Sequence, residues 1–466
     1  MVFNSIFFIF CFLPVFMMIY YLVPGKLRNL LLFLGSLIFY AWGEPVYVIL
    51  MLFSSIFNYY MGTELERLYY DDRKQKINLV FSIIINLAVL VFFKYYGFLL
   101  NTIGGIIGIH IPHPELSLPI GLSFYTFRNL SYLFDIYLSK VSAQRNFLTF
   151  SVYSTMFPYT STGPIVRYTD IETQLKQRTI NIFKFGIGAE LFVKGLAKKV
   201  LLADNLSVLY SSICGHPQMS VFTSWLGILA YTMQLYFDFS GYSDMAIGLG
   251  RMFGFHFLEN FNYPYISGSI REFWRRWHIS LSSWFRDYVY IPLGGNRVSK
   301  SRHIFNLMVV WFLTGLWHGA AWNFVAWGLY YGIILIIEKY ILSPVLDKLP
   351  SVVRHIYSIV LVVIGWVLFF SPSLGGAARY LGMMFGAGAH GVADRESLYL
   401  LTTNLVLWII LIIGSTPLTD VRYQHMLRRK KWNTTLLNGI VYAVLFILCI
   451  AYLVTETYNP FLYFRF

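Results

Sequence analysis

The chain has 466 residues, of which 57% are hydrophobic and only 12% are charged. Soluble globular proteins carry about 25% charged residues, so this composition excludes an ordinary soluble domain and indicates a polytopic membrane protein. The 36 basic residues exceed the 22 acidic ones and give a formal net charge of +14. Because the basic residues gather at the ends of apolar segments, they predict anchoring at a cytoplasmic membrane surface rather than nucleic-acid binding.

Apolar segments recur along the whole chain, and a membrane-spanning helix needs about 20 such residues. In chain order they cover 5–23, 30–43, 45–62, 77–93, 116–138, 147–166, 185–210, 221–240, 304–317, 320–342, 352–370, 398–414 and 435–454. The first lacks a basic leader and a small-residue cleavage site, so it is expected to remain as a membrane helix. Several segments are short and are expected to be re-entrant or buried. We therefore predict an all-α polytopic protein with about 11 spans.

The positions of the basic residues predict the orientation of the chain. Lys26 and Arg28 follow the first segment, which indicates an extracytoplasmic N-terminus. Arginine and lysine are also abundant in 271–303 and 422–431, so both segments are expected on the cytoplasmic side.

Two aspartates interrupt the apolar segment around 231–256. Asp238 and Asp244 stand among apolar residues, and Arg251 follows Asp244 by seven positions. Buried carboxylates need partners, which favours a structural ion pair or hydrogen-bond network. The alternative is that both aspartates line a reaction chamber. Upstream, Gly163-Pro164 predicts a helix break inside the protein.

Residues 269–291 combine arginine with tryptophan and predict an amphipathic helix that ends at Pro292. At helical spacing, one face carries the polar residues Arg271, Arg275, His278, Ser282 and Arg286. The other side carries Trp274, Trp277, Leu281 and Trp284. One interpretation is a membrane-surface helix whose arginines contact anionic lipid. The other is a binding site for a phosphate-rich donor, since the guanidinium group suits phosphate.

Residues 304–330 form an apolar run with His318 in its middle. An imidazole in hydrocarbon costs free energy unless it faces a protein interior or a wet cavity, so His318 is a candidate functional group. Thr314, Gly315 and Ala321 share its predicted helical face, and their small size leaves room beside the ring. The helix from Arg302 to His318 is about 24 Å long, which places the ring deep in the membrane or toward its outer side. The alternative is a structural histidine at a close helix crossing.

Several other types of site are absent from the sequence. There is no G-x-S-x-G, H-E-x-x-H, G-x-x-x-x-G-K-[ST] or H-x-x-x-x-D motif. The three cysteines are widely spaced, so no metal or haem site is expected. The remaining histidines fall mostly near segment ends and are expected to be solvated or interfacial, namely His110, His113, His216, His256, His303, His355, His390 and His425.

Several ordered stretches resemble the membrane-bound O-acyltransferase family, and within it the alginate O-acetyltransferase branch. They are L-P-I-G-L-S-F-Y-T-F-R-N-L from Leu118, G-P-I-V-R-Y from Gly163, Y-F-D-F-S-G-Y-S-D from Tyr236, N-F-N-Y-P-Y from Asn260, E-F-W-R-R-W-H-I-S-L-S-S-W from Glu272, L-W-H-G-A-A-W-N-F from Leu316 and the terminal P-F-L-Y-F-R-F. The resemblance is densest over 118–330 and implies one membrane domain over 1–466. Thr160-Ser161-Thr162 departs from the apolar or alanine residues usual there, which leaves the acceptor polymer open.

The resemblance implies a ring of membrane helices around a reaction chamber, in a bacterial cytoplasmic membrane. It implies transfer of an acetyl group from a cytoplasmic donor, acetyl-CoA, toward hydroxyls of an extracytoplasmic polysaccharide or peptidoglycan. An extracytoplasmic esterase-like (SGNH) protein is the implied partner, alongside membrane lipids. No resident cofactor, metal or nucleic acid is implied.

The family's essential histidine falls on His318 and its second motif histidine on His278. We expect His318 to act as a general base, because imidazole titrates near neutral pH. His278 is expected to position the thioester or stabilise developing charge. The expected donor-binding residues are Arg271, Arg275, Arg276, Trp277 and Ser282, and the expected chamber-lining residues are Thr314, Gly315, Trp317, Asp238 and Asp244.

Two other functions remain open at this point. A long-chain lipid or protein O-acyltransferase of the same superfamily is disfavoured by R-R-W-H-I-S-L-S-S-W and I-P-L-G-G-N-R, which are typical of the acetylating branch. A transporter or channel for an acetylated intermediate, with His318 lining a pore, is disfavoured because no repeat-related halves are visible.

Overall fold

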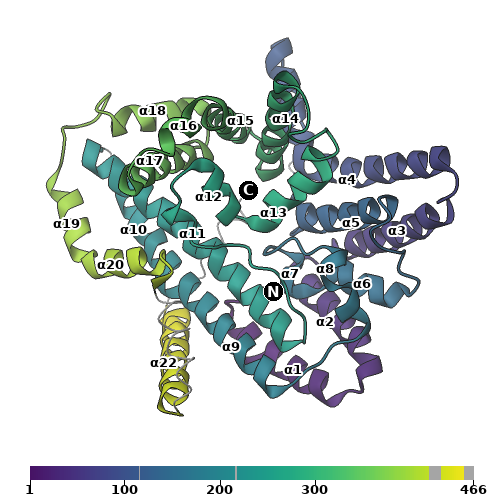
Figure 1. Cartoon of the computed structure of the whole chain (residues 1–466). Helices are drawn as coiled ribbons and strands as arrows, with labels where there is room; N and C mark the ends of the chain where they lie inside the picture. The colour runs from purple at the N-terminus through teal and green to yellow at the C-terminus, as the bar shows by residue number, and fades with distance from the viewer. Residues whose placement is uncertain (115, 216–217, 419–431, 456–466) are drawn as a thin grey trace. The chain divides into compact units, whose positions relative to one another are not determined.

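The computed structural model describes the chain except for residues 115, 216–217, 419–431 and 456–466. Every regular element in those described ranges is helical, which confirms the all-α expectation (Figure 1). The chain divides into two compact units, residues 1–192 with 243–258, and residues 193–242 with 259–466. Helices α9 (Ile182–Ala197) and α11 (Val221–Met252) continue from one unit into the other. One domain over 1–466 stays a prediction.

The first unit follows the predicted apolar segments closely. Besides parts of α9 and α11, its elements are η1 (Phe8–Phe12), α1 (Leu13–Leu22), η2 (Gly25–Leu27), α2 (Arg28–Gly43), α3 (Val48–Arg67), α4 (Asp72–Ile107), α5 (Leu122–Tyr137), α6 (Phe147–Thr155), α7 (Phe157–Thr160) and α8 (Tyr168–Lys176). Figure 1 shows α3, α4 and α5 side by side, and all three are in mutual contact. The buried amides of Asn58 on α3 and Asn86 on α4 bond each other in both directions, at 3.0 and 2.8 Å. Because buried amides need partners, this pair aligns the two helices.

The predicted helix break at Gly163-Pro164 is present. Helices α6 and α7 end before it, and Gly163 adopts a φ of +97°. The fully buried guanidinium of Arg128 donates to the carbonyl oxygens of Ser154, at 3.1 Å, and Tyr159, at 2.5 Å. Carbonyls at helix ends lack intrahelical donors, so this arginine supplies the hydrogen bonds that the carbonyls of the interrupted helix need.

The second unit contains both predicted functional histidines. Besides parts of α9 and α11, its elements are η3 (Lys198–Ala203), α10 (Asp204–Cys214), η4 (Pro264–Ile266), α12 (Ile270–Arg276), α13 (Ile279–Phe285), η5 (Arg286–Tyr290), α14 (Lys300–His318), α15 (Trp322–Ile337), η6 (Glu338–Leu342), α16 (Ser343–Leu346), α17 (Ser351–Phe370), α18 (Leu374–Met384), α19 (Arg395–Thr403), α20 (Leu405–Gly414) and α22 (Trp432–Thr455). The basic segment 422–431 and the terminal 460–466 lie outside the described residues.

Five helices of the described chain are long and apolar enough to cross a membrane, namely α3, α4, Trp322–Leu346, α17 and Leu436–Thr455. The pair α19 and α20, bent by 61°, would add a sixth. The expectation of about 11 spans is therefore not met by length and composition. Segment 30–43 forms a 16-residue helix, and 147–166 splits into helices of 9 and 4 residues. An apolar run alone does not distinguish a span from a shorter buried helix, and this ambiguity explains the excess.

Candidate functional site

His318 is the last residue of α14, and α15 begins four residues later at Trp322. The run 304–330 is therefore a helical hairpin, in agreement with the two separate apolar segments 304–317 and 320–342, and the expectation that Ala321 shares a helical face with His318 is wrong. Gly319 and Ala321 have extended backbones, with φ values of −161° and −154°, so Ala321 does not share a helical face with His318. Glycine at the turn disfavours helix continuation. Because α14 is unbroken from Arg302 to His318, the predicted length of about 24 Å holds.

The small residues beside His318 serve the contact between α14 and α15. A Cβ added at Gly315 would lie 2.4 Å from the carbonyl oxygen of Phe324, and one at Gly328 would lie 2.2 Å from that of Trp311. The backbones thus approach closely, so the space expected beside Gly315 is filled by α15. The hydroxyl of Thr314 donates to its own helix, to the Val310 carbonyl at 2.8 Å. The assignments of Thr314 and Gly315 to the lining of a reaction chamber stay predictions, and the structure favours packing roles for both residues.

Replacing Gly328 by alanine is expected to lower stability by about 1–3 kcal/mol, because the added methyl meets a backbone carbonyl that cannot rotate away. The measurement is the thermal unfolding midpoint of the purified protein in detergent. Gly375→Ala is the matched control, since nothing lies within 4 Å of its added Cβ and its helical position tolerates alanine. Equal unfolding midpoints for the two variants would contradict the close approach of the α14 and α15 backbones.

The segment 269–291 is not one continuous amphipathic helix. Helix α12 ends at Arg276, Trp277 is extended, and His278 adopts a left-handed backbone with φ +44° before α13 begins at Ile279. The predicted stripe from Arg271 to Arg286 is therefore broken at its centre. The final part of the prediction holds, since helical structure ends at Tyr290 and Gly294 and Gly295 form a turn with positive φ.

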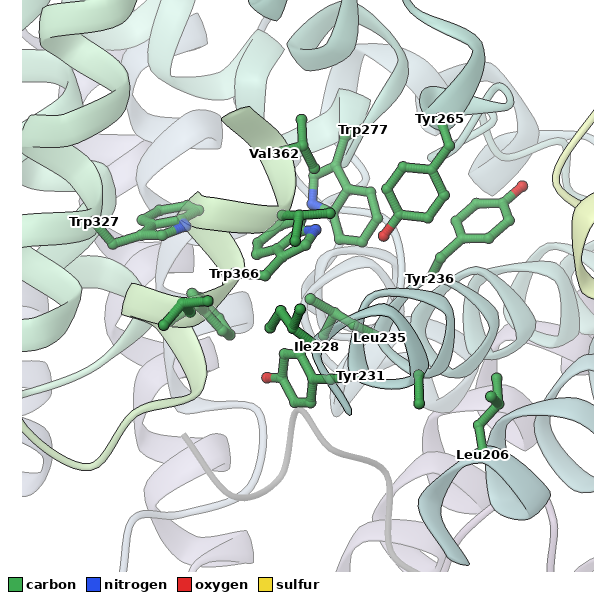
Figure 2. Close-up of a cluster of buried hydrophobic side chains, with 14 of the residues drawn as sticks. Leu206, Ile228, Tyr231, Leu235, Tyr236, Tyr265, Trp277, Trp327, Val362 and Trp366 are labelled. Atoms are coloured by element: carbon green, nitrogen blue, oxygen red, sulfur yellow. The ribbon is translucent and has the colours of Figure 1, made fainter. Parts of the chain in front are cut away.

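The tryptophans of this segment are buried in the protein rather than facing lipid. Trp274 lies edge-on to Trp311, with ring centroids 4.7 Å apart, and is 7% exposed. Figure 2 shows the rings of Trp277, Trp366 and Trp327 in succession, with centroid distances of 4.9 and 6.2 Å. Burial of large aromatic rings is a major source of packing energy. We conclude that α12 is held into the core of the second unit, which corrects the membrane-surface interpretation.

His278 has a defined hydrogen-bond environment, set by Asn260. Its Nδ1 lies 3.1 Å from Asn260 Oδ1, which also accepts the backbone N–H of Ser280 at 3.2 Å. A backbone N–H is always a donor, so the amide presents its oxygen to the ring, and Nδ1 must carry the proton. Burial lowers the pKa of His278 to about 3, so the ring is neutral near neutral pH. Nε2 therefore holds a lone pair, and no described residue bonds it.

The structure brings the two predicted histidines to the same aromatic residue. The ring centroid of Trp317 lies 5.9 Å from that of His278 and 5.0 Å from that of His318. His318 also lies edge-on to Trp327 at 4.8 Å and Phe369 at 5.3 Å, and both histidines are at most 5% exposed. Two imidazoles from separate motifs thus converge in one buried region. The 610 Å³ cavity described below is lined by neither, and a reaction chamber stays a prediction.

The predicted donor-binding residues fall on different surfaces. Arg271 and Arg275 are exposed one turn apart on α12. Arg276 is tied to the carboxylate of Glu272 at 2.9 Å, and Ser282 is half-buried on α13. Their donor-binding role stays a prediction.

Asp238 belongs to a buried ion cluster that the spacing of residues did not predict. Lys199 Nζ lies 2.8 Å from Asp238 Oδ1 and 2.9 Å from Asp204 Oδ1, and all three residues are at most 5% exposed. Lys199 lies in the π-helical turn η3 between α9 and α10. This pairing favours the structural interpretation of Asp238. Asp244 is half-buried and belongs to the other unit.

Replacing Lys199 by methionine is expected to destabilise the protein by about 3–5 kcal/mol, because two buried carboxylates lose their cation. Thermal unfolding in detergent measures the loss, and adding Asp204→Asn and Asp238→Asn should recover part of it. Lys176→Met is the control, since its ion pair with Glu172 is exposed and such pairs contribute about 0–1 kcal/mol. A Lys199→Met protein with the same unfolding midpoint as this control would contradict the buried ion cluster of Lys199, Asp204 and Asp238.

His303 was expected to be solvated or interfacial, and the solvated alternative is wrong. It is 2% exposed and lies 2.8 Å from the hydroxyls of both Tyr290 and Tyr340, and 3.1 Å from Lys339 Nζ. Two of these partners come from another helix, so the sequence around 303 does not indicate them. His216 and His425 lie outside the described residues. Asn260, which contacts His278, was not among the predicted site residues, although its N-F-N-Y-P-Y stretch was part of the resemblance.

Residues 37–374 match the model of the membrane-bound O-acyltransferase family. The chain is 41% identical to the probable alginate O-acetylase AlgI of Azotobacter vinelandii, over 89% of this chain and 85% of that protein. It is 43% identical to the Pseudomonas aeruginosa protein of the same name, over 84% and 76%. It is 30% identical to the peptidoglycan O-acetyltransferase of Helicobacter pylori, over 100% and 98%.

Proposed function

Because this chain belongs to the membrane-bound O-acyltransferase family, we propose that it moves an acetyl group from cytoplasmic acetyl-CoA toward hydroxyls of an extracytoplasmic polysaccharide or peptidoglycan. The family and its relatives make the protein a multi-pass membrane O-acyltransferase. The names of the relatives, which refer to alginate and to peptidoglycan, support a polymer acceptor.

The convergence of His278 and His318 on Trp317 is the observation that carries the proposal. A hydroxyl is a weak nucleophile at neutral pH and needs a base. We assign that role to His318. It takes the hydroxyl proton while the oxygen attacks the thioester carbonyl, a C–O bond forms, and the C–S bond breaks. The proton then passes from the imidazolium to the departing CoA thiolate, so the enzyme returns to its starting state.

The hydrogen bond to Asn260 narrows the role of His278. With Nδ1–H committed to the amide, Nε2 can accept a hydrogen bond or a proton but cannot donate one. This favours positioning of the donor, by accepting an N–H or O–H, over stabilisation of a developing oxyanion. Arg271 and Arg275 would contact CoA phosphates from the exposed face of α12.

The wider setting of the reaction follows from the same proposal. Bacterial relatives support a place in the bacterial cytoplasmic membrane. An extracytoplasmic esterase-like partner would receive the acetyl group or pass it to the polymer.

The proposal is tested with purified protein supplied with radiolabelled acetyl-CoA or long-chain acyl-CoA and polysaccharide or peptidoglycan acceptors. We expect label to appear on a hydroxyl acceptor from acetyl-CoA alone, with the partner protein added where the polymer by itself is not labelled. Transfer from long-chain acyl-CoA only would support a lipid or protein acyltransferase instead. Release of the acetyl group across a vesicle membrane without transfer would support a transporter.

A further inference from the structure

The first unit contains a cavity of about 610 Å³, a volume typical of small-molecule sites. It lies where the connection from α8 to α9 meets the end of α11. Its lining includes Arg178, Thr179, Lys184, Arg251 and Phe255. Two arginines and a lysine thus line the cavity, and no carboxylate does.

The cations of this cavity are not neutralised by the protein. Arg178, Lys184 and Arg251 make no ion pair with any carboxylate in the part of the chain that the structure describes. Lys184 Nζ donates only to Thr179, and Arg251 Nε has no hydrogen-bond partner there. Positive charges gathered in one concave site repel one another and attract anions. The cavity therefore favours a negatively charged ligand.

One of the arginines is held in place before any ligand binds. Arg178 Nε donates to Tyr20 Oη at 2.9 Å, and its Nη1 donates to Asn29 Oδ1 at 2.8 Å. Its guanidinium also stacks over the Phe255 ring at 4.6 Å. A side chain that is already ordered loses less conformational freedom on binding, so this arrangement favours affinity.

The cavity lies on the side of the membrane expected to be cytoplasmic. Asn29, which accepts a hydrogen bond from Arg178 of the cavity, directly follows Arg28. Arg28 and Lys26 are the residues that predict the cytoplasmic loop after the first segment. Arg28 lies against the same Tyr20 ring that contacts Arg178, at 5.8 Å, and adds a further positive charge.

We propose that this cavity binds a phosphate-bearing anion at the cytoplasmic face. Guanidinium and ammonium groups form short, charge-assisted hydrogen bonds to phosphate oxygens. The source of the phosphate is either a soluble nucleotide diphosphate, as in CoA, or the headgroup of an anionic phospholipid. The site does not depend on the proposed acetyl transfer, since its occupancy is measured without turnover.

The test uses the purified full chain in neutral detergent, with pyrophosphate and CoA titrated by calorimetry. A parallel arm reconstitutes the protein in nanodiscs with phosphatidylglycerol and counts retained lipid by native mass spectrometry. The variants are Arg251→Gln and Lys184→Gln, because neither side chain links two elements. Arg73→Gln, an exposed residue of α4, removes the same charge and is the control.

We expect Arg251→Gln to weaken binding by about tenfold or more, with a smaller loss for Lys184→Gln and none for Arg73→Gln. If the Arg251→Gln and Lys184→Gln variants lose binding of pyrophosphate and CoA, the ligand is a nucleotide diphosphate. If they lose only the retained phosphatidylglycerol, the ligand is a lipid headgroup. The proposal is overturned if the wild type binds none of these probes, or if all variants bind them as Arg73→Gln does. Unfolding midpoints equal to that of the wild type confirm that the variants are folded.

Discussion

Replacing His318 by alanine is expected to reduce acyl transfer by about 10²- to 10⁴-fold, which is the usual contribution of a general base. The ring lies in the core between Trp317, Trp327 and Phe369. Radiolabel transferred per minute by purified protein measures the effect. His318→Gln is included because it keeps more of the side-chain volume and limits the cavity left in the aromatic core.

The matched control is His110→Ala, which removes an exposed histidine of the first unit. This variant should retain wild-type transfer. The unfolding midpoint and size-exclusion profile of each variant separate loss of chemistry from loss of fold. A well-folded His318→Ala protein that transfers label at the wild-type rate would end the assignment of this residue as the base.

Replacing Asn260 by leucine is expected to lower transfer by about 10- to 100-fold, the cost known for losing the partner that orients a functional histidine at metal sites. We propose Asn260 as a positioning residue, because its Oδ1 accepts His278 Nδ1–H and sets which ring nitrogen has the lone pair. Without that acceptor, the two neutral tautomers of His278 compete. Asn262→Leu is the control, since this neighbouring side chain is exposed.

The pH profile distinguishes this positioning role from a merely structural one. In the wild type, burial holds the pKa of His278 at about 3, so the ring stays neutral through the assay range. In Asn260→Asp, a carboxylate beside Nδ1 favours the imidazolium and raises that pKa. Protonation would then occupy Nε2 at low pH, so transfer by Asn260→Asp should fall as pH decreases and recover as pH rises. A profile parallel to that of the wild type, with activity lowered equally at every pH, would indicate only a structural role for Asn260.

The sequence indicated a membrane protein, because the apolar composition and the length of the segments follow directly from the apolar interior and the thickness of the membrane. It also indicated His318, a polar ring in an apolar run, and His278, on a predicted polar face, as candidate functional residues, because both lie in stretches that resemble the family. Their roles stay predictions. Its error at 269–291 arises at one position. Periodicity describes one continuous helix, whereas His278 adopts a left-handed backbone, and the backbone N–H groups of Ile279 and Ser280 that follow it donate to Asn260, earlier in the chain.

Residue types and their order thus determined the helical membrane fold and the family, and they indicated two candidate histidines. Only the tertiary structure decided their surroundings. It placed His318 at a helix end, filled the space beside Gly315 with a second backbone, and paired Asp238 with Lys199 rather than with a residue at helical spacing. These features depend on contacts between elements far apart in the chain. The spacing of residues along one helix cannot predict these contacts, because a buried polar group bonds whichever partner the packing of the elements places near it.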